Sequence, residues 1–392
     1  MVIDKRKFID YSILTVLIAM SGVPNFNSKP LTVIVFSILL FIFIVRKKNF
    51  NAGFLWFFVL LVVITFLQAF KFQFFPIVTN FGFLLMVFLA YLIVKILGNK
   101  FISYYVNILY YMAIVSFVFY FPILLIPSVA SLIPVDQSII IYNFNVYVWN
   151  STIVRNSGPF WEPGAFAGYL IVAFIFNFLK EVQIINKKNI VLFIAIVTTL
   201  STTAYLALFV FFFFIYYNKI KNVLFKAGAV IIMVLVGVYA YTTFDFLGKK
   251  IESQLEVAQT MGIQKSDDSQ RFLTILRDIQ DFKGHEWIGR GGHDKTRYDL
   301  QPTNEMIART VGLTDVLVRL GIIIFIILFY FVFKSICSYL EWLHKRKHIY
   351  CFGFFIAILV TLMSEVYFNL PMYWSLLFLQ FVYKQNEEIR TI

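Results

Sequence analysis

The residues best suited to chemistry lie in the string RNSGPFWEPGAFAGYL, residues 155 to 170. Arg155 and Glu162 flank a Gly-Pro pair, and a second proline follows at Pro163. Because proline suits the first turn of a helix, we expect a helix to begin at Pro163. Glu162 then lies beside the positive end of the helix dipole, which favours a carboxylate. Such a group accepts a proton or binds a hydroxyl; the alternative is that Arg155 and Glu162 only pair to fix a turn.

A second polar set combines DDSQRF, residues 267 to 272, with GRGGH, residues 289 to 293. Backbone N–H groups in a glycine run approach an anion closely, and a guanidinium adds paired donors. Five arginines between residues 271 and 309 favour planar, two-point recognition of phosphate or carboxylate over general cationic attraction. They are Arg271, Arg277, Arg290, Arg297 and Arg309. The alternative for any one of them is a solvated surface charge.

Other chemistries have little support in the sequence. His285-Glu286 and His293-Asp294 stand in a glycine-rich stretch without an HExxH pattern, so we expect no metal and no cofactor. Ser201-Thr202-Thr203 is interpreted as a turn between two helices rather than a nucleophile. Glu365, at the outer end of a predicted span, either lines a cavity or forms a structural salt bridge.

The elements that position these residues must lie in a membrane. Hydrophobic residues make up 60% of the 392 and charged residues only 14%, against about 25% in soluble domains. Mean hydropathy is +0.81, and the chain holds 48 Phe and 22 Tyr. Cys337 and Cys351 give no disulfide framework and no metal-ligand spacing. The composition therefore predicts an all-α, polytopic membrane protein.

We predict about twelve transmembrane helices in a single domain over residues 1–392, each from an apolar run near the length that a bilayer requires. The runs are 8–23, 31–45, 53–68, 77–97, 104–126, 164–180, 190–202, 203–217, 226–244, 312–333, 350–366 and 371–383. Two longer segments remain, a first outer loop at 127–163 and a second, between helices 9 and 10, at 245–311. The second loop contains two amphipathic stretches, Leu247 to Ala258 and Arg271 to Phe282, and a non-helical stretch from Gly284 to Gly292.

The distribution of Lys and Arg sets the orientation. With twelve spans, most basic residues fall in the short loops on one side, and the opposite short connections hold only Lys29, Lys71 and Arg155. Positive loops face the cytoplasm, so we expect both termini to be cytoplasmic and the two large loops to be extracytoplasmic. The charge of +13 is thus mainly a topology signal, and we expect no nucleic-acid partner.

The chain resembles the Wzy-type O-antigen and capsular polysaccharide polymerases of the O-antigen ligase-like superfamily in four features, which occur in the same order along the sequence. They are Arg155 to Gly164 before a span, LSTTAYLAL at 200–208, Ser269-x-Arg271 through Gly289-x-Gly291, and GLTDVLVRLGI at 312–322. The resemblance implies a GT-C-like, metal-independent glycosyltransferase of the bacterial cytoplasmic (inner) membrane. Its donor and its acceptor would both be undecaprenyl-diphosphate-linked oligosaccharides, and it would be surrounded by membrane lipid. Its protein partners would be a chain-length regulator and a flippase.

By the same resemblance, Arg155 and Arg271 are expected to be the essential catalytic arginines, with Arg290 as a third. We hypothesise that Arg271 and Arg290 hold the diphosphate, that Arg155 positions the donor or acceptor, and that Glu162 assists the attacking hydroxyl. Further residues expected to bind substrate are Gly158, Gly291, His293, Arg297 and Asn304. The family's ligases carry a histidine late in the second loop, whereas PTNEMIART at 302–310 has none, which favours a polymerase. An O-antigen ligase-type transferase, a lipid-linked oligosaccharide flippase or transporter, and a non-catalytic scaffold remain alternatives.

Overall fold

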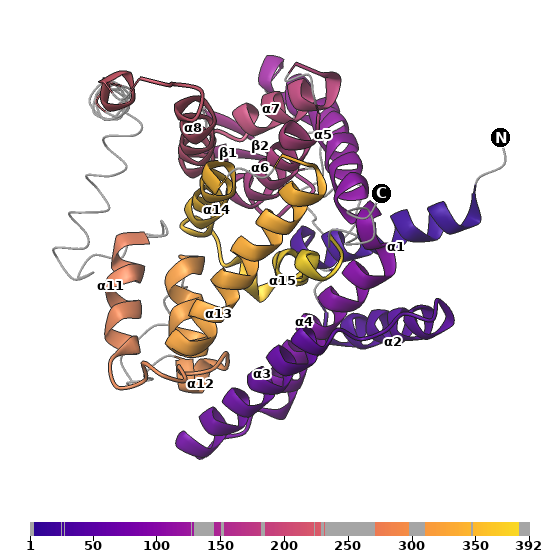
Figure 1. Cartoon of the computed structure of the whole chain (residues 1–392), viewed down its shortest axis with the longest axis vertical. Helices are drawn as coiled ribbons and strands as arrows, with labels where there is room; N and C mark the ends of the chain where they lie inside the picture. The colour runs from indigo at the N-terminus through magenta and orange to yellow at the C-terminus, as the bar shows by residue number, and fades with distance from the viewer. Residues whose placement is uncertain are drawn as a thin grey trace.

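Helices make up most of the computed structural model, which describes residues 4–24, 26, 28–126, 128, 145–149, 153–181, 185–222, 224–228, 231, 271–297, 310–345 and 348–383 (Figure 1). The helices are α1 (Lys5–Gly22), α2 (Lys29–Val45), α3 (Ala52–Lys71), α4 (Ile77–Leu97), α5 (Phe101–Leu125), α6 (Pro163–Lys180), α7 (Lys187–Thr198), α8 (Thr202–Tyr217), α11 (Arg271–Phe282), α12 (Asp294–Arg297), α13 (Gly312–Trp342), α14 (His348–Leu362) and α15 (Pro371–Phe378). The same described residues also contain two short strands, β1 (Asn145–Trp149) and β2 (Ile153–Gly158), and the 3-10 turns η1 (Gly98–Lys100), η4 (Tyr367–Asn369) and η5 (Leu379–Phe381).

Within the part of the chain that the structure describes, four helical stretches are long and apolar enough to cross a membrane, namely Ala52–Lys71, Ile77–Leu125, Pro163–Lys180 and Gly312–Trp342. Large apolar side chains are also exposed on the outside of the bundle, among them Phe70 at 85% and Trp56 at 76%. Exposed apolar surface of this kind suits contact with lipid rather than water. These features agree with the prediction of a mainly α-helical membrane protein. The predicted span 226–244 lies mostly outside the described residues.

Local sequence explains where several helices begin. The side chains of Ser28, Asn51 and Asn186 accept hydrogen bonds from backbone N–H groups in the first turns of α2, α3 and α7. These residues are preferred helix caps because they satisfy otherwise unpaired donors. Pro163 and Pro371 occupy the first turns of α6 and α15. The predicted helix start at Pro163 is therefore confirmed.

The most deeply buried helix is α6, in which every residue from Pro163 to Leu179 is buried. Tyrosine hydroxyls connect its first turns to neighbouring segments. Tyr367 donates to the Gly164 carbonyl at 2.9 Å, and Tyr169 donates to the Ser21 carbonyl at 2.6 Å. Gly168 has no room for a side chain, because a Cβ there would overlap the hydroxyl of Tyr367. The start of α6 is thus held by segments from both ends of the chain.

A hairpin of β1 and β2 departs from the all-α prediction. The strands pair antiparallel, with Tyr147 opposite Arg155, inside the segment predicted as the first outer loop. The Asn156 amide donates to Ser116 of α5 at 2.9 Å and to Thr198 of α7 at 3.1 Å. These bonds attach β2 to two helices and fix the direction in which the chain enters α6.

The helix α13 is interrupted at Gly321, whose φ of 74° is non-helical. The sequence predicted one span over 312–333, but the uninterrupted part of the helix is 322–342. Its 21 residues extend about 31 Å at 1.5 Å per residue, enough to cross a bilayer. The segment before the break lies beside α11, which contacts α13 (Figure 1).

Candidate functional site

Two carboxyl groups meet at the start of α6. Glu162 immediately precedes Pro163, and Glu365 lies three residues beyond the end of α14. A Cβ placed on Gly164 would lie 3.2 Å from the Glu162 Oε1 and 3.1 Å from the Glu365 Oε1. Glycine at position 164 thus leaves the space in which both carboxyls face the first turn of the helix. Glu365 is buried, with 8% of its surface exposed.

Arg271 brings a positive charge to this pair from a third part of the chain. It is the first residue of α11, and its Nη2 lies 3.8 Å from the Glu365 Oε1. Its Nε is buried and has no hydrogen-bond partner among the described residues. A buried N–H without an acceptor is unfavourable, so the arginine retains a donor suited to a bound anion. Arg271, Glu162 and Glu365 are therefore the titratable side chains that the fold concentrates here.

The environment of Glu365 favours its protonated form. Burial raises the pKa of Glu365 well above its ordinary value, and the neighbouring Glu162, through a hydrogen bond and its charge, raises it further. The positive charge of Arg271 and a hydrogen bond with Trp161 act in the opposite direction. Burial and a neighbouring like charge both disfavour the ionised form of Glu365, so the site favours a protonated Glu365.

The turn before α6 is fixed by packing. Phe160 is fully buried, with its ring 4.6 Å from that of Tyr169 and 5.3 Å from that of Phe166. Gly158 has a φ of 52°, and a Cβ there would lie 2.7 Å from the Phe166 ring. A residue with a side chain does not fit this conformation. Gly158, predicted to bind substrate, here allows the turn that places Glu162.

Arg155 lies on β2, seven residues before Glu162. Its Nε donates a 3.0 Å hydrogen bond to the carbonyl of Thr199, in the turn between α7 and α8. That turn includes Ser201, which precedes α8 as the sequence predicted. Arg155 thus links the strand to the turn between α7 and α8, at the residue directly before the LSTTAYLAL motif.

Arg297 lies within the second predicted loop, and its side chain is only 2% exposed. It forms ion pairs with Asp278 at 2.6 Å, Asp281 at 2.9 Å and Asp315 at 3.2 Å. Burial raises the pKa of Asp278, while the charge of Arg297 lowers it. Arg297 was expected to bind substrate, but each of its nitrogens contacts a carboxylate that belongs to α11 or α13. Its evident role is to join these helices to α12.

Arg290 is also buried and bonded to the loop around it. Its Nε donates to the Asp281 carbonyl at 2.6 Å, and its Nη1 donates to the Thr296 carbonyl at 3.5 Å. Asp281 lies ten residues along α11 from Arg271, which corresponds to about 15 Å of helix. The structure therefore places Arg271 and Arg290 at opposite ends of α11 and does not bring them together around one group.

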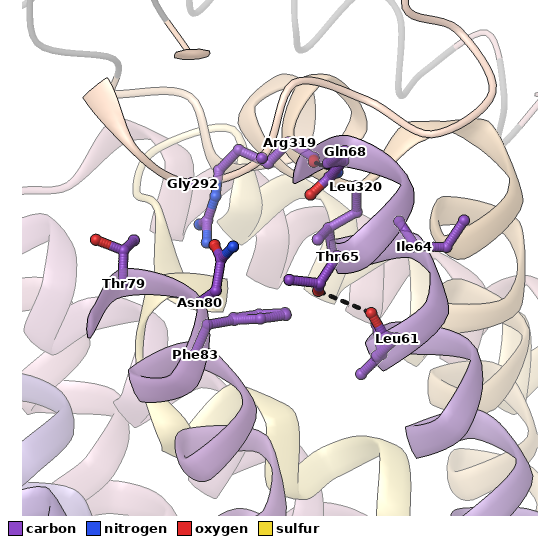
Figure 2. Close-up of a pocket in the computed structure, with 11 residues that line it drawn as sticks. Leu61, Ile64, Thr65, Gln68, Thr79, Asn80, Phe83, Gly292, Arg319 and Leu320 are labelled. Atoms are coloured by element: carbon purple, nitrogen blue, oxygen red, sulfur yellow. Dashed lines mark hydrogen bonds between the residues drawn. The ribbon is translucent and has the colours of Figure 1, made fainter. Parts of the chain in front are cut away.

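A narrow pocket with both polar and apolar lining residues lies beneath the glycine-rich loop, between α3 and α4 (Figure 2). Figure 2 shows the Arg319 side chain reaching toward Asn80, with the Phe83 ring below. Gln68 donates to the carbonyls of Ile288 and Arg319, at 2.5 and 2.8 Å. The pocket is lined by Leu61, Ile64, Thr65, Gln68, Thr79, Asn80, Phe83, Gly291, Gly292, Arg319 and Leu320.

Two other predicted substrate-binding residues border this region. Gly291 lines the pocket, and the His293 ring lies 4.9 Å from that of Phe74 in an edge-on contact. The His293 Nδ1 accepts a hydrogen bond from the backbone N–H of Lys295 at 3.1 Å. Asn304 lies outside the described residues. Neither Arg319 nor Gln68 was predicted, although Arg319 stands within the GLTDVLVRLGI motif and Gln68 is a polar residue in an apolar span.

Comparisons of this chain with protein-family models, with curated proteins and with solved structures find no match. The site is therefore interpreted from its own residues and geometry.

Proposed function

We propose that this protein is a polysaccharide polymerase of the bacterial cytoplasmic membrane. It joins undecaprenyl-diphosphate-linked oligosaccharide repeat units at the outer face, within a twelve-span, GT-C-like fold whose termini are cytoplasmic. The observation that carries the proposal is the meeting of Arg271 with Glu162 and Glu365 at the start of α6. An arginine and two carboxyls from three distant segments provide an anion-binding donor and a proton acceptor in one place.

Arg271 supplies electrostatic stabilisation in this reaction. When the sugar leaves its lipid carrier, the bond from the anomeric carbon to the diphosphate oxygen breaks, and the diphosphate gains a negative charge. A guanidinium ~4 Å from a phosphate oxygen contributes about 4 kcal/mol at an effective dielectric of about 20. Where the interaction forms mainly in the transition state, this corresponds to a rate factor on the order of 10³. The buried Nε of Arg271 is a donor for this contact.

Glu162 accepts the proton of the attacking sugar hydroxyl. It is partly exposed at the start of α6, whereas Glu365 is buried. A proton acceptor must lie within hydrogen-bond reach of the group that it deprotonates, and the more accessible carboxyl meets this requirement. Arg155 positions the donor or acceptor from β2. Arg290 and Arg297 maintain the structure of the loop that begins at α11.

The decisive experiment follows chain growth in purified protein supplied with its lipid-linked repeat unit, with products separated as a ladder on a gel. Arg271→Ala should lower the rate on the order of 10³-fold while membrane levels stay normal. Arg271→Lys should recover only part of it, because lysine lacks the planar pair of donors. Lys283→Ala, an exposed change just beyond α11, is the matched control and should leave the ladder unchanged. Full-length polymer from Arg271→Ala would contradict the assignment.

A further inference from the structure

Glu365 is a buried acid for which the reaction described above has no use. Its carboxyl and that of Glu162 lie against the same glycine, Gly164. The groups that face it come from several elements: Glu162 before α6, Arg271 of α11, Tyr367 of η4 and Tyr373 of α15. The tyrosines are ordinarily neutral near pH 7, so Glu162 and Arg271 are the charged partners.

Charge balance determines how many protons this group of residues holds. With one shared proton, the two carboxyls carry a single negative charge, which Arg271 neutralises. With no proton, they carry two negative charges against one positive charge in a buried site, which is costly. The singly protonated pair next to Arg271 is therefore the resting arrangement that the geometry favours.

We propose that Glu162 and Glu365 act as one carboxyl pair with a single shared proton, and that Glu365 is the positioning residue that keeps Glu162 ready to accept the proton of the attacking hydroxyl. This inference rests on the proposed transferase function. Glu365 holds the shared proton toward Glu162, which leaves the outer oxygen of Glu162 for the sugar hydroxyl.

The step is balanced in atoms and charge. The hydroxyl O–H bond breaks and its proton moves to Glu162, while the hydroxyl oxygen forms a bond to the anomeric carbon. The bond between that carbon and the diphosphate oxygen breaks, and its electron pair remains on the diphosphate. The carboxyl pair becomes neutral as the diphosphate gains one negative charge. The negative charge that the carboxyl pair places beside Arg271 is thereby removed in the same step that creates a new one on the leaving group.

The first measurement needs no activity. The full-length protein in lipid nanodiscs is titrated from neutral to alkaline pH, and infrared difference spectra follow the protonated carboxyl band. The wild-type protein should lose one buried protonated carboxyl over this range, and Glu365→Gln should lack that signal. A Glu365→Gln spectrum identical to wild type would overturn the shared proton. Because no substrate is present, this result is independent of the proposed function.

The second measurement is the pH dependence of chain lengthening. The wild-type rate should fall in alkaline solution as the shared proton is lost. Because only one proton is lost, the steepest expected decline is about 10-fold per pH unit. Glutamine at position 365 cannot ionise but can still donate to Glu162, so Glu365→Gln should remain active where wild type declines. Glu162→Gln should be inactive at every pH.

Three outcomes separate the two ideas. An alkaline decline in Glu365→Gln equal to that of wild type would overturn the role of Glu365, as would a folded but inactive Glu365→Gln at every pH. A wild-type protein that moves but never lengthens its lipid-linked substrate would overturn the transferase proposal itself, and the infrared result would then stand alone.

Discussion

Gly289 and Gly321 face each other across the break in α13 so closely that neither position has room for a side chain. A Cβ on Gly289 would lie 2.6 Å from the Gly321 nitrogen, and a Cβ on Gly321 would lie 2.7 Å from the Gly289 nitrogen. Both have positive φ, at 72° and 74°. Backbone bonds on either side, Arg290 N–H to Val318 and Ile322 N–H to Glu286, each measure 2.8 Å. The loop and the helix break therefore fix each other.

Replacing Gly321 with alanine should destabilise the protein by more than the cost of its backbone conformation. Gly284→Ala is a matched control, because Gly284 has a φ of 78° but nothing within 4 Å of a new Cβ. The control should lose about 1–2 kcal/mol through backbone strain alone. Gly321→Ala adds overlap with backbone atoms that cannot move independently, so its unfolding temperature in detergent should fall further. Equal losses in the two variants would contradict the close approach.

Replacing Arg297 with methionine should cost about 3–5 kcal/mol of unfolding free energy, the usual result of removing one partner from a buried ion pair. Asp278 has no exposed surface and would remain without its counter-charge. Chemical denaturation followed by tryptophan fluorescence measures the loss, with the exposed Lys283→Ala as the control. A loss no larger than that of the control would mean that Arg297 does not hold α11 to α13.

Gln68→Leu should weaken the contact between α3 and the glycine-rich loop. The Gln68 amide donates to the carbonyls of Ile288 and Arg319, and the Arg319 carbonyl also accepts the Gly291 N–H. The loss therefore falls mainly on the Ile288 carbonyl, and an unpaired carbonyl costs about 1–3 kcal/mol. Thr65→Val, one turn earlier in α3, removes a hydroxyl that bonds only its own helix at the Leu61 carbonyl, and it should cost less. Hydrogen exchange over residues 284–292 should rise in Gln68→Leu alone. Matching exchange in both variants would rule out the proposed anchoring role.

The stability of the protein should depend on pH through Glu365. Because burial raises the pKa of Glu365, the folded protein retains a proton that the unfolded chain releases. This contribution is complete below the ordinary carboxyl pKa and is lost as the pH rises through the higher folded value, by at most about 1.4 kcal/mol per pH unit. Glu365→Gln should therefore flatten the decline in unfolding free energy at high pH. Parallel curves for the two proteins would exclude Glu365 as the source.

Much of the fold was predictable because apolar runs and helix-starting residues act locally. The amphipathic spacing in 271–282 predicted helix α11 and its end at Phe282, and Pro163 predicted the start of α6. The hairpin of β1 and β2 was missed, since two strands of five and six residues leave too short a pattern to separate from a loop.

The composition of the site was only partly predictable. Glu162 and Arg271 were identified from their own surroundings, but nothing near Glu365 in the sequence indicates that it meets Glu162. The break at Gly321 is similarly hidden, because apolar residues continue on both sides and a distant loop stabilises the positive φ. Arg297 resembles an exposed loop arginine until its three carboxylates, from two other helices, are placed around it.

The arrangement around Arg297 also has a consequence for biosynthesis. Asp278 and Asp281 leave the ribosome shortly before Arg297, whereas Asp315 follows with the start of α13. A nascent chain that has not yet inserted α13 therefore lacks one of the three acids that enclose this guanidinium. The three carboxylates can enclose Arg297 only after the start of α13 has been synthesised, so the contacts that hold α11, α12 and α13 together are completed by the segment that is made last.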